Sequence, residues 1–183
     1  MLDKLKKGLP PIFTYHGFDH VMDVMEAAER IGKSEGLSEE DMELLRVAVL
    51  FHDSGFLVNP KGHEEIGCDM AEKELPDFGY VKYEIAKICG MIRATKYPHH
   101  PAGKMEEIIC DADLDYLGRD DFFEIGNKLY RELRARKILN TEEEWNRLQV
   151  NFLASHHYFT PTALQTRNEK KQENVERVRR LIN

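Results

Sequence analysis

Three short segments of the chain carry histidine and aspartate side chains that could together hold a metal ion. The first carries His20, and the second places His52 next to Asp53 at the end of an apolar run. The third carries Asp113 within another apolar segment. Imidazole nitrogens and carboxylate oxygens together favour Mn, Fe, Co, Ni or Zn over Mg or Ca. Four such ligands would leave two positions of an octahedral ion open for water and substrate.

Two of these residues also have a structural interpretation when each is considered alone. His20 could be a buried histidine whose ring nitrogens are satisfied by protein partners, and Asp113 could be an acid on a helix surface. The combination favours a metal site, because one divalent cation would offset the cost of burying all of these polar side chains.

The elements that must position these residues are expected to be helices. Apolar residues recur at helical spacing along nearly the whole chain, and residues that cap or stop helices separate the apolar stretches. The expected helices cover residues 18–35, 38–52, 63–75, 81–95, 104–117, 121–139, 141–158 and 160 onward. We therefore expect a single all-α domain, residues 1–183, with about seven to nine helices. The motifs fall in a core of about residues 12–160, and a C-terminal helix covers about 161–183.

The set of motifs resembles that of the HD-domain superfamily of metal-dependent phosphohydrolases. Members have a His, a later His-Asp doublet and a further Asp on a helical core. His20 and the His52-Asp53 doublet match the first two in order and spacing, and Asp113 matches the last better than either neighbouring aspartate. The resemblance implies one divalent transition metal, Mn, Fe, Co, Ni or Zn, held by these four side chains. It also implies hydrolysis of a nucleotide or another phosphate ester, by a phosphomonoesterase or a phosphodiesterase.

His63, which follows the loop after the doublet, gains an expected role from this resemblance. A histidine at this place in HD proteins either binds a second metal or contacts substrate. Proteins with two metals also have histidines at the end of the next helix, where this chain has Arg93 to Lys96. We therefore expect a single metal, with Asp53 catalytic and His63 as a proton donor or phosphate contact. The alternative is that His63 is an exposed histidine at the start of a helix.

Phosphate recognition would need cationic side chains, and the chain has several beyond the doublet. Arg93, Lys96, His99 and His100 form a basic segment in a protein of net charge -7, and Lys61 lies in the loop after the doublet. Arginine in particular offers a fork-shaped donor for phosphoryl oxygens. We predict that these five residues contact the substrate. The alternative is that they belong to solvated loops.

The favoured function is a phosphohydrolase in which a metal-activated water attacks phosphorus, while Asp53 holds both the metal and the water. One alternative is a non-catalytic HD-fold module that binds a nucleotide or signals to a partner. A less favoured alternative is a dinuclear-iron oxygenase, which would need more histidine ligands than we can place in this chain.

The composition limits the partners and the location of the protein. With 33 acidic and 26 basic residues, the chain does not favour binding to nucleic-acid backbones. No apolar stretch approaches the roughly 20 residues that span a bilayer, and the N-terminus lacks the pattern of a signal sequence. We therefore expect a cytoplasmic protein that acts on a small-molecule phosphate ester or nucleotide and has no membrane partner. The sequence is also compatible with a homo-oligomer.

The remaining unusual residues have structural interpretations. The three cysteines lie in apolar helical segments and are expected to be reduced core thiols. His156 and His157 are expected to lie near the end of a helix, where its dipole favours cations. Trp145 is expected to pack in the interior. The charged residues of the last helix, Lys171 among them, are expected to form a solvated face.

Overall fold

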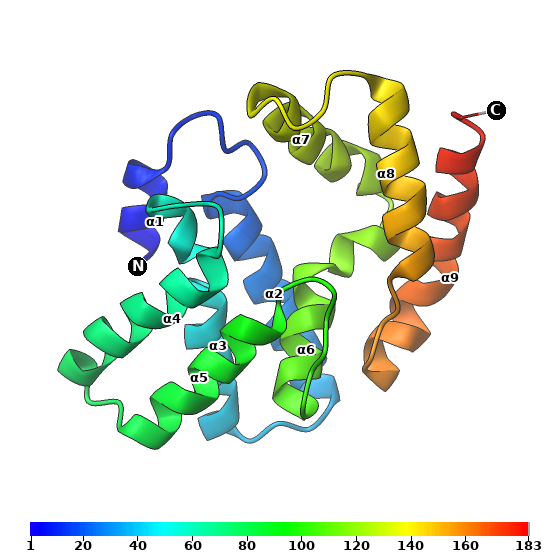
Figure 1. Cartoon of the computed structure of the whole chain (residues 1–183). Coiled ribbons are helices and arrows are strands. Elements are labelled where there is room, and N and C mark those ends of the chain that lie inside the picture. Colours follow the sequence, from blue (N-terminus) through cyan, green and yellow to red (C-terminus); the bar gives the residue numbers. More distant parts are fainter. Residues whose placement is uncertain (183) are drawn as a thin grey trace.

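The structure, a computed structural model, describes residues 1–182, and these residues form helices joined by turns and loops (Figure 1). The α-helices, in chain order, are α1 (Leu2–Gly8), α2 (Phe18–Ser34), α3 (Glu39–Phe51), α4 (His63–Glu74), α5 (Lys82–Ala94), α6 (Lys104–Asp113), α7 (Phe122–Ala135), α8 (Glu142–Ser155) and α9 (Pro161–Arg179). Three short 3₁₀ helices, η1 (Ser54–Leu57), η2 (Leu75–Phe78) and η3 (Asp115–Gly118), follow α3, α4 and α6. There is no strand within residues 1–182, which confirms the predicted all-α fold. No helix in this range has the length and apolar character needed to cross a membrane.

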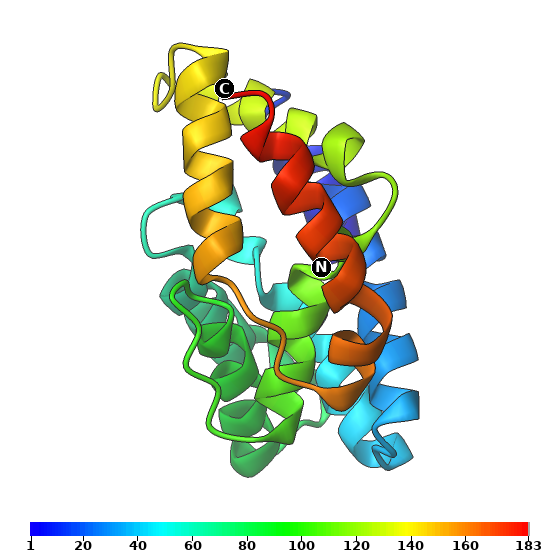
Figure 2. The same ribbon diagram turned by 90° about the vertical axis from the view of Figure 1, so that its right-hand side faces the viewer.

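Two clusters of buried apolar side chains hold the helices together. The first lies among α1 to α6 and includes Leu45 and Ile108. The second lies among η3 and α7 to α9 and includes Phe122, Leu153 and Val178. Figure 1 shows α7, α8 and α9 on one side of the molecule and α1 to α5 on the other. In the turned view of Figure 2, α8 and α9 run side by side, and the two helices are in contact.

Three helices begin at the capping residues that the sequence predicted. The Ser38 hydroxyl accepts a hydrogen bond from the Asp41 backbone N–H at 3.1 Å, at the start of α3. Thr141 and Thr160 accept the corresponding bonds at the starts of α8 and α9. Pro161 occupies the first turn of α9, where its missing N–H leaves no helical hydrogen bond unmade. These helix starts are set by local chemistry, which is why the sequence locates them.

Several helix ends were predicted wrongly. Helix α6 ends at Asp113 rather than at residue 117, α7 at Ala135 rather than 139, and α8 at Ser155 rather than 158. Helix α1 was not predicted, and its single buried residue, Leu5, packs against the first apolar cluster. Helix α9 begins as predicted but ends at Arg179 rather than near residue 183, and the other predicted helices agree with the structure to within one or two residues at each end.

The early end of α6 follows from distant ion pairs that the local sequence does not reveal. Leu114 leaves helical geometry, with φ -111° and ψ 18°, and the chain continues as the 3₁₀ helix η3. Asp115 at the start of η3 lies 2.6 Å from Arg30 Nη2 of α2 and 2.8 Å from Arg167 Nε of α9. Because Asp115 is almost fully buried, these two arginines are the partners that its charge needs.

The burial of Lys171 contradicts the prediction that the charged residues of the last helix, this lysine among them, form a solvated face. Its side chain is only 2% exposed, and its ammonium group donates to the backbone carbonyl of His156 at 2.6 Å. The early end of α8 makes this contact possible, because His156 takes an extended conformation there. The ammonium group also lies 3.3 Å from His156 Nδ1, so the lysine joins α9 to the segment after α8.

Two other structural predictions are confirmed. Cys68, Cys89 and Cys110 are all buried and unpaired. Trp145 is buried, and its ring stacks on that of Tyr130 with centroids 5.8 Å apart. These residues contribute to packing, although Trp145 also borders the pocket described below.

Candidate metal centre and the adjoining pocket

Three helix ends meet beside the first apolar cluster and bring the predicted metal ligands together. Helix α2 packs against α3 and α6, so the first turn of α2 lies close to the C-terminal ends of the other two. His20 Nε2 of α2 lies 3.0 Å from Asp113 Oδ1 of α6 and 3.4 Å from Nε2 of His52, which follows α3. One ligand atom from each of these three residues lies within 4.8 Å of the other two.

Asp53 adds a fourth potential ligand from the loop after α3. Its Oδ2 lies 3.4 Å from His52 Nε2 and 3.5 Å from His20 Nε2. The same oxygen is buried and has no hydrogen-bond partner among the described residues, which is costly for a carboxylate. Two imidazole nitrogens and two carboxylate oxygens suit a divalent transition metal. The residues present therefore fit the predicted ion, and their role as its ligands stays a prediction.

The ring of His52 is oriented so that its free nitrogen faces this group. His52 is fully buried, and its Nδ1 lies 2.8 Å from the backbone carbonyl of Val49. A carbonyl oxygen only accepts hydrogen bonds, so Nδ1 carries the proton, and in the neutral ring Nε2 keeps its lone pair. Such a backbone contact fixes the tautomer and orientation of metal-binding histidines.

Burial and mutual charge act in opposite directions on the pKa values of these groups. Burial alone would lower the pKa of His52, but the carboxylates of Asp53 and Asp113 outweigh it and raise that pKa to about 9. Burial alone would raise the pKa of both carboxyl groups, but the nearby imidazoles outweigh it and hold both pKa values below the usual range. The two aspartates therefore supply the negative charge that a divalent cation would need.

The two aspartates that neighbour Asp113 have other partners. The Asp111 carboxylate accepts hydrogen bonds from the backbone N–H of Phe159 at 2.9 Å and from that of Thr160 at 2.7 Å. It also accepts a bond from the Thr160 hydroxyl at 2.7 Å. Asp115 is held by the two arginines described above. Of the three, the structure brings Asp113 to the imidazoles of His20 and the doublet, and its role as the final ligand stays a prediction.

His63 begins α4 and lies directly beside the candidate metal ligands. Its Nδ1 lies 3.1 Å from the Pro60 carbonyl, and its Nε2 lies 3.4 Å from Asp53 Oδ1. Gly55 allows this approach, because a Cβ at that position would lie 2.6 Å from the Cα of His63. His63 therefore lies next to Asp53, and its catalytic role stays a prediction.

A further imidazole, that of His16, borders the pocket and was given no role from the sequence. Its Nδ1 lies 2.7 Å from Glu132 Oε1 of α7, and its ring stacks on Phe56 with centroids 4.2 Å apart. The fully buried Glu132 also accepts the backbone N–H groups of Tyr15 and His16. Burial would raise the pKa of Glu132, but the bond from His16 outweighs it and lowers that pKa. The two residues are 116 positions apart, so no local pattern could have paired them.

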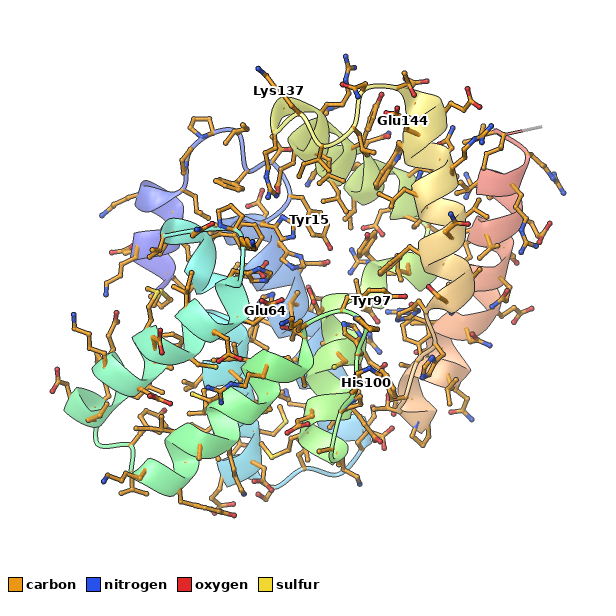
Figure 3. All side chains as sticks on the ribbon, in the orientation of Figure 1. Tyr15, Glu64, Tyr97, His100, Lys137 and Glu144 are labelled. Carbon is orange, nitrogen blue, oxygen red and sulfur yellow. The ribbon has the colours of Figure 1, made fainter. Side chains whose placement is uncertain are left out.

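A pocket of about 380 Å³ opens from these residues toward α7 and α8. Asp53, Asp113, His16 and His63 lie at its polar end, together with the carboxylate of Glu64. Most of the remaining wall is apolar or aromatic, with contributions that include Tyr116, Phe122, Trp145, Leu148 and Phe152. Figure 3 labels Tyr15, Glu64 and Tyr97, which line the pocket from three separate segments and lie around the middle of the view.

The five predicted substrate contacts do not line this pocket. Arg93 forms an ion pair with Glu65 at 2.9 Å and lines a separate cavity with Lys96 and His100. His99 lines a third cavity, and Lys61 is exposed in the loop before α4. The sequence suggested these residues because a phosphate needs cationic partners, but their side chains line other surfaces. Their predicted contact with substrate therefore has no support from this geometry.

Comparisons with known proteins agree with the fold. The HD domain family model matches residues 17–120, which is more than half of the chain. The structure is similar to the crystal structure of a predicted HD superfamily hydrolase from an uncultured Thermotogales bacterium, with a TM-score of 0.64 and 21% sequence identity. That likeness covers 99% of this chain and 88% of the other, and at this identity it shows the fold alone. No curated protein matches the chain. The family match, which spans all four predicted metal ligands, shows that the chain belongs to the HD-domain family.

Proposed function

We propose that the protein is a metal-dependent hydrolase that acts on phosphate esters. The observation that carries this proposal is the convergence of His20, His52, Asp53 and Asp113 beside a pocket that the two aspartates line, with Asp53 Oδ2 buried and unsatisfied. Membership of the HD-domain family supports it, as does the likeness to a predicted HD superfamily hydrolase.

The chain offers four ligands for one divalent transition metal ion, Mn, Fe, Co, Ni or Zn. Two are the imidazole nitrogens of His20 and His52, and two are the carboxylates of Asp53 and Asp113. When bound, such an ion lowers the pKa of a coordinated water toward neutrality and polarises phosphoryl oxygens. The Val49 carbonyl, which fixes the His52 ring, would support this geometry from behind.

Asp53 and His63 are positioned to remove the proton of an attacking water. Asp53 Oδ1 faces His63 Nε2 at 3.4 Å, while Asp53 Oδ2 faces the two imidazoles of the candidate metal centre. A proton accepted at Asp53 Oδ1 therefore has a neighbouring nitrogen to which it can pass. Glu64 Oε1 lies 3.7 Å from the same nitrogen of His63 and stabilises positive charge there.

His16 is our candidate for the group that protonates the leaving oxygen of the ester. Because the Glu132 carboxylate only accepts hydrogen bonds, it holds the proton of His16 on Nδ1 and fixes the ring. The other ring nitrogen, Nε2, is then the one available to a ligand, since His16 lines the pocket. Glu132 is buried and contacts the ring only at Nδ1, so a His16 ring that carries a proton on both nitrogens can donate from Nε2 to the leaving oxygen.

The experiment that tests this proposal measures phosphate release by the purified protein loaded with Mn, Co or Ni. Substrates would be a panel of phosphomonoesters and phosphodiesters that includes nucleotides, and the controls would be His52→Ala and Asp53→Asn. We expect turnover that both substitutions reduce by at least a hundredfold. Turnover that His52→Ala leaves unchanged, or no turnover by the wild-type protein on any ester, would refute the hydrolase proposal. Tight nucleotide binding without turnover would instead indicate a binding module.

The metal content of the same preparation separates this proposal from a dinuclear oxygenase. Elemental analysis should give about one transition metal ion per chain, because four ligands of the right kind converge on one point. Two iron ions per chain would indicate the oxygenase.

A further inference from the structure

The pocket beside the candidate metal centre differs sharply between its two ends. Five charged or imidazole groups, those of His16, Asp53, His63, Glu64 and Asp113, lie at one end, and the opposite wall is built by apolar side chains of α7 and α8. From α8, Trp145, Leu148 and Phe152 face the pocket on successive turns, at spacings of three and four residues. One stripe of α8 therefore presents a continuous apolar surface to whatever occupies the pocket.

Cationic side chains that could bind further phosphates do not line this pocket. Within residues 1–182, no lysine or arginine contributes to its wall, and the only nitrogen bases there are His16 and His63. Arg93, Lys96 and His100 line a different cavity. A di- or triphosphate would bring several negative charges that need charge-assisted donors. The metal end of the pocket can therefore neutralise the charge of one phosphoryl group. The rest of the wall has no cationic side chain for a second phosphoryl group.

The polar groups along the wall that could recognise a sugar already have protein partners. The Tyr97 hydroxyl shares a hydrogen bond with Ser155 Oγ, and the hydroxyls of Tyr15 and Tyr116 bond to each other. The Thr95 hydroxyl donates to the Ile92 carbonyl at 2.8 Å, so its proton is already used. The Gln149 amide nitrogen lies 3.4 Å from the Asn146 side-chain oxygen, within the same helix. Ribose hydroxyls placed here would lose water without gaining enough partners, which is unfavourable.

These observations lead to a substrate class. We propose that the pocket selects esters in which a single phosphoryl group is attached to a bulky apolar alcohol, with an aromatic ring favoured. The part of this proposal that concerns the phosphoryl group rests on the hydrolase function proposed above. A volume of about 380 Å³ lies at the lower end of the range of small-molecule sites and accommodates a naphthyl group or a medium-length alkyl chain. Burial of each added methylene should raise kcat/KM about three- to fourfold until the pocket is filled.

Trp145 provides a binding signal that does not depend on turnover. It is the only tryptophan in the chain, and it lines the apolar part of the pocket. Fluorescence titrations of the Zn-loaded protein would use three probes that resist hydrolysis: methylphosphonate, 1-naphthylmethylphosphonate and the α,β-methylene analogue of ADP. We expect the naphthyl compound to bind at least tenfold more tightly than the other two. Equal or tighter binding of the ADP analogue would overturn the proposal.

Two matched leucine variants test whether the naphthyl compound binds against the apolar wall of the pocket. Leu148 and Leu164 are both 44% exposed, but only Leu148 lines the pocket. Leu148→Gln should weaken binding of the naphthyl compound at least fivefold, while Leu164→Gln on α9 should leave it unchanged. Equal effects of the two substitutions would show that the compound binds elsewhere or is held by nonspecific apolar contact, and would contradict the proposal.

Hydrolysis assays on a series from propyl to octyl phosphate separate this inference from the hydrolase function. A preference for the naphthyl probe without turnover of any ester would refute the hydrolase proposal and leave the apolar specificity standing as a property of binding. Turnover that rises with alkyl length supports both. Turnover that is fastest with nucleotides would sustain the hydrolase and overturn the apolar specificity.

Discussion

His16 Nδ1 lies 2.7 Å from Glu132 Oε1, and this contact joins the loop before α2 to α7 at the edge of the candidate metal centre. The carboxylate belongs to a helix that contributes no predicted metal ligand, yet it fixes the ring that borders the pocket. Helix α7 therefore contributes both to the apolar wall, through Phe122, and to the orientation of a polar group at the opposite end.

The first prediction concerns this pair. Glu132→Gln removes the charge that fixes the His16 ring, so kcat should fall by about 10- to 100-fold, as is typical for groups that orient functional histidines. Metal content should stay unchanged, because Glu132 does not face the candidate ligands. Glu169→Gln, at an exposed position of α9, serves as the control and should have no effect.

A double-mutant cycle shows whether Glu132 acts through His16. If it does, the combination of His16→Asn with Glu132→Gln should be no slower than His16→Asn alone. Additive losses of kcat would mean that the two residues act independently, and would contradict the positioning role of Glu132.

A second prediction concerns acid stability and His156. Burial, with smaller effects from Lys171, His99 and His157, lowers the pKa of this imidazole to about 3. Asp113 acts weakly in the opposite direction. Between pH 6.5 and about 3, the unfolded chain therefore binds a proton at His156 and the folded chain does not. The contribution of this pKa shift to the free energy of unfolding is fully present above the ordinary pKa of 6.5. It is lost as the pH falls from there toward about 3.

Chemical denaturation between pH 4 and pH 8 measures this effect. The wild-type free energy of unfolding should fall below pH 6.5, with a contribution from His156 of up to about 1.4 kcal/mol per pH unit. His156→Asn keeps an acceptor for Lys171 but cannot titrate, so this contribution should disappear. His157→Asn, at the exposed neighbouring position, removes only one of the smaller effects on His156 and should retain most of the wild-type slope. Identical slopes for the wild type and His156→Asn would rule out His156 as the source.

The fold and the core of the candidate site could be predicted from the sequence because local chemistry determines them. Ser38 and Thr160 show this for helix starts, since each bonds to a backbone N–H three residues later. The His52-Asp53 doublet and Asp113 were recognisable because each falls at the end of an apolar helix. Their order along the chain matched a known pattern.

What the sequence could not supply are contacts between residues far apart in the chain. The end of α6 depends on ion pairs from Asp115 to α2 and α9, and the pairing of His16 with Glu132 spans 116 positions. The predicted phosphate contacts have no support from the pocket geometry for a related reason. The sequence shows that Arg93 is cationic, but not that its side chain pairs with Glu65.

A third prediction concerns Gly55, which allows the loop after α3 to pack against His63. An added methyl group would lie 2.6 Å from the His63 Cα, which is backbone and cannot rotate away. Gly55→Ala should therefore destabilise the protein by about 1–3 kcal/mol or more through overpacking. Gly103→Ala is the matched control, because its added methyl group would meet no neighbouring atom within 4 Å and its backbone is extended. Thermal unfolding of both variants tests this prediction. Equal melting temperatures for Gly55→Ala and Gly103→Ala would show that the loop moves to accommodate the added methyl group.

The last prediction separates the predicted metal ligand Asp113 from its buried neighbour Asp111. Saturating metal at about 100 times its Kd should stabilise the wild-type protein by about 2.7 kcal/mol, which raises the melting temperature by roughly 5–10 °C. Asp113→Asn should abolish this shift, because the carboxylate that faces His20 is lost. Asp111→Asn should lower the melting temperature with and without metal, because three donors from Phe159 and Thr160 lose their ionised acceptor. It should nevertheless keep most of the metal-induced shift. A shift that survives Asp113→Asn but is abolished by Asp111→Asn would move the predicted ligand by two residues and invalidate the assigned register.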